Sequence, residues 1–310
     1  MTWQSIIDDI VTDNLSGATA IAFNAARAIG AMCREEPFES QESLLDVMRS
    51  MAGRLVTNQA GMAPLVTLLN RVFFAASGAP DTVTALEASV DAAEAFVAEV
   101  EEARRESVRR ATNLIPNRIT ILTHTYSSTV AMLLTQAAQA GRGTRVICLE
   151  ARPMCEGQRM AVELAEAGLD VTLTIDAAAH DMLRACDLVV VGADNLNETG
   201  AMSKIGTAGI AVSAKSLGVP IYVVADSTKI WPASLGAPPI SDHSAAEVWE
   251  DAPATVRVLN RYFDTTPWQA VSGVVTEQGL LTPDEVCTAS RQKPVHRYLQ
   301  TIVAEVHRHT

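Results

Sequence analysis

The chain has 310 residues, enough to bury a large core in one large domain or in a helical unit joined to an α/β unit. Its 36 acidic residues outnumber its 24 lysines and arginines, so the formal net charge is -12. Proteins that grip nucleic acid cluster Lys and Arg against the phosphate backbone, and this chain does not. Composition therefore argues against a nucleic-acid partner.

Two sequence features bear on location. The first residues carry acids at Asp8 and Asp9, where a signal peptide has a basic leader. No uninterrupted apolar run reaches the length of a membrane span. We therefore expect a cytoplasmic protein that makes no membrane contact.

The five cysteines are scattered, without the close pairs that build a zinc site or a disulfide framework. They are Cys33, Cys148, Cys155, Cys186 and Cys287. Cys155 follows Arg152 and Pro153 in a loop, and it is either a reactive thiol or an inert exposed one. We expect neither a metal nor a cofactor.

Residues 2 to about 110 are helical in pattern, with Ala, Leu, Met and Glu recurring at three- and four-residue spacing. The pattern predicts four or five helices. Their starts are expected at Ser16, at Ser40 and at the break that ends in Pro80 and Asp81.

After Pro116, short β-rich runs alternate with helical stretches of roughly ten to fifteen residues, which is typical of βαβ units. The predicted strands are residues 119–123, 145–149, 171–175, 188–191, 221–225 and 272–276. The predicted helices are 128–140, 157–167 and 206–217, with a short turn near 182–184 and a last helical segment from 283 towards 306. The pattern predicts an α/β fold, with an N-terminal helical domain (1–115) and a doubly wound parallel sheet domain (116–310).

Three loops are candidates for functional roles. Residues 14–18 and 58–64 each place small or flexible residues at a helix start. Each is either a plain helix cap or part of a site. Residues 231–243 hold three prolines and show no period, and this loop is long enough to be a lid or an interface arm.

Three predicted strands end in polar side chains. The motifs are Thr123-His124-Thr125-Tyr126-Ser127-Ser128, Glu150-Ala151-Arg152-Pro153 and Gly192-Ala193-Asp194-Asn195. Because ligands of doubly wound sheets bind at the carboxyl ends of the strands, these groups should converge. Ser127 and Ser128 with their amides would cradle a phosphate, and Arg152 would add a fork of donors. The alternative is that Ser127 is only an N-cap.

Asp194 follows a valine-rich apolar strand and should stand at the mouth of this cleft. Further on, Lys204 precedes Gly206 and Thr207, which open a helical run, so a cation and free helix amides would face the same cleft. A carboxylate beside an anion site indicates chemistry on a phosphorylated substrate. Alternatively, Asp194 caps a turn and Lys204 is a solvated charge at a helix end.

Six stretches, taken in order, resemble the motifs of one superfamily. They are Thr123-His124-Thr125-Tyr126-Ser127-Ser128, Glu150-Ala151-Arg152-Pro153, Gly157-Gln158-Arg159-Met160-Ala161, Gly192-Ala193-Asp194, Lys204-Ile205-Gly206-Thr207 and Phe263-Asp264-Thr265-Thr266-Pro267. The superfamily comprises the alpha, beta and delta subunits of eukaryotic initiation factor 2B, methylthioribose-1-phosphate isomerase and ribose-1,5-bisphosphate isomerase. The resemblance covers most of residues 116–281. It implies an N-terminal helical domain, a C-terminal Rossmann-like domain and a homodimer formed through the latter.

For the isomerase branches, the resemblance implies an aldose-to-ketose shift that uses a Cys after the Thr-His pair and the Asp of Gly-Ala-Asp. The corresponding residues here are Thr125 and Asp194, so the carboxylate is present and the thiol is missing. The difference matters because proton transfer needs groups with pKa values near the working pH, and a threonine hydroxyl does not titrate there.

Other positions depart from the isomerases in the same direction. The arginine of their Arg-Gly-Ala phosphate loop falls at Ser16, a second phosphate-binding arginine falls at Gln59, and their Asn-Lys pair is Ser203-Lys204. Losing two arginines removes much of the charge-assisted grip on a bisphosphate. The Thr-His-Thr-Tyr-Ser sequence looks closer to the initiation-factor subunits.

Two functions therefore stay open. The first is a sugar-phosphate isomerase-like enzyme that binds a small phosphorylated metabolite, with Asp194, Thr125 and His124 as catalytic residues. The residues expected to hold the substrate and its phosphate are Ser16, Gly17, Tyr126, Ser127, Ser128, Arg152, Asn195, Ser203, Lys204, Gly206 and Thr207. The second function is a non-catalytic regulatory or assembly subunit, related to initiation factor 2B, whose pocket senses a ligand.

Overall fold

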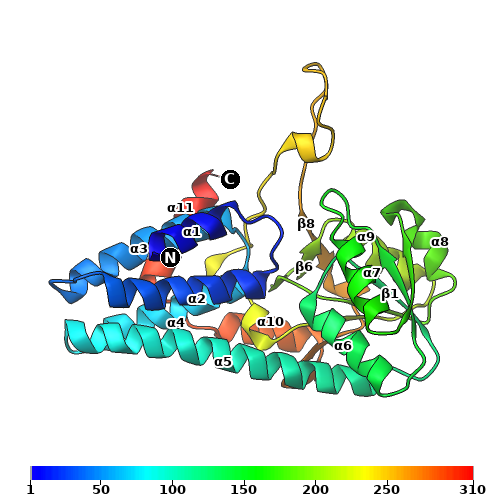
Figure 1. The fold of residues 1–310 in the computed structure, drawn as a ribbon, viewed down its shortest axis with the longest axis horizontal. Coiled ribbons are helices and arrows are strands. Elements are labelled where there is room, and N and C mark those ends of the chain that lie inside the picture. The colour runs from blue at the N-terminus through cyan, green and yellow to red at the C-terminus, as the bar shows by residue number, and fades with distance from the viewer. Residues whose placement is uncertain (1, 310) are drawn as a thin grey trace.

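Five helices precede the first strand. They pack together on one side of the molecule, and the long α5 extends from there beneath the sheet to α6 (Ser128–Gln139) (Figure 1). The computed structural model describes residues 2–309. The helices are α1 (Trp3–Thr12), α2 (Ala18–Glu35), α3 (Gln41–Asn58), α4 (Ala63–Gly78) and α5 (Thr82–Leu114). Two of the predicted starts are confirmed, because Ser40 caps α3 and Asp81 caps α5 through their side chains. The cap of α2 is Gly17, one residue later than the predicted start.

The C-terminal helix α11 (Arg297–His309) returns to this bundle and packs against α3 and α4 (Figure 1). Leu299 and Val303 of α11 are buried in the same core as the first helices. Trp231 also enters this core with its side chain fully buried. The hydrophobic core of the bundle therefore draws on residues from both ends of the chain.

The second part of the molecule is built on a seven-stranded sheet. Its strands are β1 (Thr120–His124), β2 (Arg145–Leu149), β3 (Asp170–Thr174), β4 (Leu188–Val191), β7 (Ile221–Val224), β9 (Gly273–Thr276) and β10 (Gly279–Leu281). The order is β10-β9-β7-β4-β1-β2-β3, and every pair is parallel except β10 with β9. The chain steps outward from β1 to β3 and then crosses back to β4. The predicted α/β class with a doubly wound sheet is therefore confirmed.

Alternate residues of each strand face opposite sides of this sheet, so two separate cores form. Ile121 and Val190 face a core that includes α6 (Ser128–Gln139), α7 (Glu156–Glu166) and the end of α5. Leu122 and Val189 face a core that includes α8 (Ala179–Leu183), α9 (Thr207–Ser216) and α10 (Pro283–Gln292). None of the helices within residues 2–309 is both long enough and apolar enough to span a membrane.

A second, three-stranded sheet was not predicted. It pairs β6 (Gly200–Lys204) antiparallel with β5 (Asn195–Leu196) and with β8 (Phe263–Pro267). All five residues of β6 are buried, so the strand shows no alternation of polar and apolar residues that could have been recognised in the sequence. This small sheet carries Lys204 at its end.

The chain from Trp231 to Tyr262 has no regular element longer than a single 3-10 turn within the part that the structure describes. The predicted irregular loop at 231–243 is therefore confirmed. Beyond it the chain extends outward as an arm, coloured yellow to orange in Figure 1, and returns where Asp242 pairs with Arg261. The arm exposes apolar side chains, among them Trp249 and Leu259.

Candidate functional site

A cleft lies where the carboxyl ends of the strands face the starts of α2 and α4. It has two adjoining hollows that share six lining residues, Ser16, Gly17, Thr125, Tyr126, Asp194 and Lys204. We call one the strand-side hollow, which Ser127, Ser128, Arg159 and Lys229 also line. The other is the arm-side hollow, which Gln59, Glu156, His243 and Tyr262 also line.

Asp194 follows β4 and joins the sheet to the helical bundle. Its backbone amide donates to Met202 O at 2.9 Å, and its carbonyl accepts from the Ala63 amide at 3.2 Å, where α4 begins. Its Oδ1 accepts from the Ala18 amide, 3.4 Å away, where α2 begins. Both loops that the sequence left open as caps or site residues therefore meet at Asp194.

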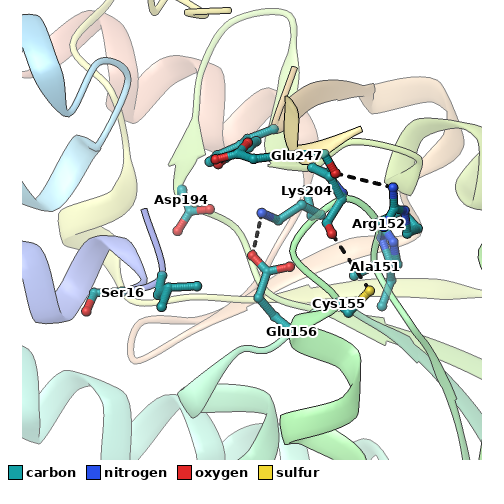
Figure 2. Close-up of polar contacts among 12 residues, drawn as sticks. Ser16, Ala151, Arg152, Cys155, Glu156, Asp194, Lys204 and Glu247 are labelled. Carbon is teal, nitrogen blue, oxygen red and sulfur yellow. Dashed lines mark hydrogen bonds and ion pairs between the residues drawn. The ribbon is translucent and has the colours of Figure 1, made fainter. Parts of the chain in front are cut away.

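Lys204 ends β6 and is only 5% exposed. Its Nζ lies 2.5 Å from Glu156 Oε1, and the ammonium stands 4.6 Å from the centre of the Tyr262 ring. Figure 2 shows this ammonium turned towards the Glu156 carboxylate. The predicted phosphate-binding cation is thus already paired with a carboxylate and an aromatic face.

Lys229 is a second buried cation of the cleft, and the sequence analysis did not single it out. It is 6% exposed, and its Nζ donates to Ala193 O at 2.6 Å. It comes shortly after β7, at the same edge of the sheet as the other strand ends. We searched the ends of three predicted strands for polar side chains. The same search at the end of the predicted strand 221–225 would have found Lys229.

Thr125 directly follows β1 and lines both hollows. Its φ is 63°, in the left-handed region that β-branched residues rarely adopt. Such backbone strain persists only where the surroundings enforce it, and it is concentrated at functional sites. The strained turn holds Thr125 against the cleft.

His124, by contrast, lies behind the cleft wall and is 1% exposed. Its Nδ1 is 2.9 Å from Thr207 Oγ1, which itself donates to Lys204 O at 2.6 Å. Because the threonine proton is used in that bond, His124 Nδ1 must be the donor. His124 Nε2 lies 3.6 Å from Asp176 Oδ1. These contacts position β1 and the start of α9, and none of them reaches the cleft.

Asp176 holds the loop that follows β2. Its two carboxylate oxygens accept from the amides of Ala151 and Arg152, each at 2.8 Å. Burial alone would raise the pKa of this carboxyl, but the contacts with His124 and the two amides outweigh it and hold the pKa below its usual range.

Two predicted anion-binding elements are used differently in the structure. Arg152 is exposed, and its Nη2 donates to the carbonyls of Glu247 and Val248 in the arm at 3.3 and 3.2 Å, as Figure 2 shows for Glu247. The amide of Gly206 donates to Asp264 Oδ2 at 2.7 Å, so this carboxylate already occupies the start of α9. Neither Arg152 nor Gly206 and Thr207 line the two hollows.

Of the remaining predicted residues, some line the hollows and others do not. Ser127 caps α6, accepting from the Val130 amide, and it lines the strand-side hollow. Ser203 also lines this hollow, and its hydroxyl donates to Gly192 O at 2.9 Å. Asn195 is fully buried outside both hollows, and its amide donates to Gly61 O at 3.0 Å.

The far end of the arm-side hollow is built without arginine, as far as the described residues show. Gln59 Nε2 donates to Ile10 O at 2.6 Å and to Asp13 O at 2.9 Å. The Ser16 amide donates to Asp13 Oδ1 at 2.8 Å. Ser16 and Gln59, the positions at which the resemblance implies isomerase arginines, thus hold the loop between α1 and α2 in place. Within residues 2–309, no group of three or more His, Cys, Asp and Glu could hold a metal ion.

Comparison with known proteins identifies the family. The model of the initiation factor 2 subunit family matches residues 14–283. The chain is 32% identical over 292 residues to a ribose 1,5-bisphosphate isomerase of Haloferax volcanii, covering 92% of this chain and 90% of that protein. It is 30% identical over 308 residues to a methylthioribose-1-phosphate isomerase of Syntrophotalea carbinolica, covering 92% and 89%.

A solved structure gives the same result. The translation initiation factor eIF-2B of Pyrococcus horikoshii OT3 superposes with a TM-score of 0.78 at 26% identity, covering 91% of this chain and 98% of that one. This superposition agrees with the α/β fold described above. The chain therefore belongs to the initiation factor 2 subunit family.

Proposed function

We propose that the cleft binds a phosphorylated sugar and that the protein is an aldose-ketose isomerase with a non-standard site. The observation that carries this proposal is the charge of the strand-side hollow. Among the described lining residues are three cationic side chains, Arg159, Lys204 and Lys229, and one carboxylate, Asp194, in a chain whose net charge is -12. Glu156, which pairs with Lys204, lines only the other hollow, so positive charge still prevails here. Concentrating positive charge in one hollow of an acidic protein favours an anionic ligand.

The phosphate would lie in the strand-side hollow. There the start of α6, a helix of 12 residues, offers the amides beside Ser127 and Ser128. Lys229 supplies a buried positive charge, and Arg159 lines the same wall with its guanidinium 3.8 Å from the centre of the Tyr126 ring. Anchored at this end, the sugar would extend past Asp194 towards Lys204.

Asp194 would act as general base on a sugar carbon, and Lys204 would stabilise the negative charge that develops on the neighbouring oxygen. Both side chains line both hollows, so the reacting carbons would lie between them. The isomerase names of two relatives support this reading.

The departures at Ser16 and Gln59 favour a substrate with one phosphate. Neither residue offers a charged donor, and the Gln59 side chain is committed to two backbone carbonyls. A second phosphate in the arm-side hollow would face Glu156, Asp13 and Asp194, which line that hollow as well. Like charges so close together oppose binding.

The test is a thermal-shift and turnover panel of inorganic phosphate, ribose 5-phosphate, ribose 1-phosphate, ribose 1,5-bisphosphate and glucose 6-phosphate. A ligand at 100 times its Kd stabilises the folded protein by about 2.7 kcal/mol, which corresponds to a Tm rise of about 4 °C for a chain of this length. Isomerisation of a binding sugar should fall about 1000-fold in Asp194→Asn, because a positioned base contributes on the order of 100- to 10000-fold. Unchanged turnover in this variant would exclude Asp194 as the base.

A second function is favoured by one specific observation, the hydroxyl of Thr125 where the isomerase branches carry a thiol. On this alternative the chain is a non-catalytic regulatory or assembly subunit related to initiation factor 2B, and the cleft only senses a ligand. It predicts a ligand-induced Tm rise with no turnover, together with co-purification of a translation-factor partner. A homodimer that isomerises a sugar phosphate would exclude it.

A further inference from the structure

Glu156 is a second carboxylate of the cleft, and one of its oxygens has no partner. Its side chain is 13% exposed, and Oε1 lies 2.5 Å from Lys204 Nζ. Oε2 is buried and accepts no hydrogen bond from any residue that the structure describes. A buried carboxylate oxygen without a donor is costly, so it indicates a group that meets its partner only when a ligand is bound.

The backbone around Glu156 is fixed by several contacts. Cys155 precedes it in the left-handed conformation, with φ of 56°. Gly157 follows it so closely packed that a Cβ there would lie 1.8 Å from Leu149 O. The loop leading to it is held by Asp176 and by the bond from the Cys155 amide to Ala151 O. A side chain on such a rigid support can be placed accurately relative to a substrate.

Glu156 and Asp194 line the same arm-side hollow as Lys204. Figure 2 shows both carboxylates turned towards the Lys204 ammonium. Asp13, His243 and Tyr262 also line this hollow, but Glu156 and Asp194 are the two proton-carrying carboxylates turned towards the Lys204 cation. Thr125, which stands where a thiol would act, adds no group that titrates near neutral pH.

We propose that Glu156 is the second proton-transfer group of the isomerisation, working with Asp194 in place of the missing thiol. This proposal rests on the proposed function. Asp194 takes the proton from C2 of the sugar, and the electron pair of that C–H bond forms the C1=C2 bond. Negative charge then collects on the oxygen of C1, beside Lys204. For a closed sugar that oxygen is the ring oxygen, and its bond to C1 breaks in this step.

Glu156 completes the shift by moving the hydroxyl proton. Its Oε2 takes the proton from the C2 hydroxyl, so that C2 becomes a carbonyl. It then delivers this proton to the negatively charged oxygen, which is the C1 oxygen of an open sugar or the former ring oxygen of a closed one. Asp194 then returns its proton to C1. One proton has moved from C2 to C1 and one between the two oxygens, and Asp194, Glu156 and Lys204 all end as they began.

The alternative role for Glu156 is structural, as the ion-pair partner that holds Lys204 in place. The two roles predict different behaviour for Glu156→Gln. The glutamine keeps an acceptor oxygen for Lys204, but it cannot carry the proton between the sugar oxygens. Under our proposal the carbon proton is still removed by Asp194, while the later step stalls.

The experiment follows the fastest substrate of the panel above in D2O by NMR. We expect Glu156→Gln to lower kcat at least 100-fold with KM and the ligand-induced Tm rise unchanged, while deuterium still enters C2 of the recovered aldose. Asp194→Asn should lose both isomerisation and exchange. Glu166→Gln, an exposed carboxylate on the same helix, should behave as the wild type.

Three results would overturn the proposal. Equal turnover in wild type and Glu156→Gln removes the role of Glu156 and leaves the proposed function standing. Parallel loss of exchange and isomerisation in Glu156→Gln, with binding intact, makes Glu156 a positioning residue for Lys204. No turnover of any panel member by the wild type removes the proposed function together with the role of Glu156.

Discussion

The two hollows of one cleft are built from different chemistry. The strand-side hollow has two buried or partly shielded lysines, an arginine and a helix start, with Asp194 as its only carboxylate among the lining residues described. The arm-side hollow shares Lys204 with it, but adds the carboxylates of Glu156 and Asp13 and the stacked rings of His243 and Tyr262, 3.5 Å apart. One end suits an anion, and the other suits hydroxyl groups and a ring or carbon surface.

This difference bears on the departures from the isomerases that the sequence motifs indicate. The strand-side hollow depends on backbone amides and on lysines at strand ends, which follow directly from the doubly wound sheet. The arm-side hollow depends on side chains from loops, among them Gln59 and the shared Ser16, the positions at which the resemblance implies arginines in the isomerases. A shared fold can keep one end of a binding site while the loops change the other.

The largest expected effect tests the close packing of Gly157, which holds Glu156 in the arm-side hollow. Gly157→Ala places a Cβ 1.8 Å from the Leu149 carbonyl oxygen, a backbone atom that cannot swing away. We expect the free energy of unfolding to fall by about 3 kcal/mol or more, measured by chemical denaturation. The matched control is Gly209→Ala in α9, where nothing lies within 4 Å of the new Cβ. It should stabilise the protein by about 0.5–1 kcal/mol through better helix propensity.

The folded fraction of Gly157→Ala also tests whether the two hollows are separable. Its inorganic-phosphate binding should weaken less than its isomerisation, because Lys229 and the start of α6 lie outside α7 and only Arg159 of the strand-side hollow is on that helix. Its isomerisation should be lost, because Glu156 is displaced. Loss of phosphate binding as well would show that the hollows form one unit.

The next largest effect tests the strand-side hollow. Lys229→Met keeps most of the side-chain volume but removes a buried positive charge. We expect the Kd for inorganic phosphate to rise roughly 100-fold, because a hydrogen bond to a charged group is worth up to about 3 kcal/mol. Calorimetry would measure this Kd. Lys215→Met removes an equal charge from the exposed end of α9 and should leave the Kd unchanged, whereas equal losses in the two variants would show only a long-range charge effect.

The sequence predicted the sheet well because its strands are short, apolar and bounded by turn residues. The predicted strands 145–149 and 188–191 agree with β2 and β4 to the residue. Both are flanked by Gly, Asp or polar residues that stop the run, so their limits are local properties. The positions of Thr125 and Ser127 follow from the end of β1, and that of Asp194 follows from the end of β4.

What the sequence did not predict are the contacts between residues far apart in the chain. The Gly206 amide donates to Asp264, which lies 58 positions later in the chain. Arg152 donates to the carbonyl of Val248 in the arm, 96 positions later. The pairing of Glu156 with Lys204 is of the same kind. No local pattern reports which carboxylate will meet which donor, so only the folded structure shows that some candidate anion sites are already filled.

The smallest expected effect tests whether a second phosphate can bind in the arm-side hollow. Ser16→Arg restores a cation to the arm-side hollow at a half-buried position that lines both hollows. A charge-assisted bond to a second phosphate is worth about 1.5 kcal/mol, so affinity for ribose 1,5-bisphosphate should rise roughly 10-fold. Affinity for ribose 5-phosphate should rise less, because its single phosphate would lie beside Lys229 and the start of α6, although Ser16 also lines that hollow. Ser216→Arg, which adds the same charge at the exposed end of α9, is the control, and Kd values for both sugars can be measured by calorimetry. Because Asp13 lies beside the new guanidinium, adding Asp13→Asn to Ser16→Arg should increase the gain in affinity for the bisphosphate. If both sugars gained equally from Ser16→Arg, the assignment of one phosphate to the strand-side hollow would be wrong.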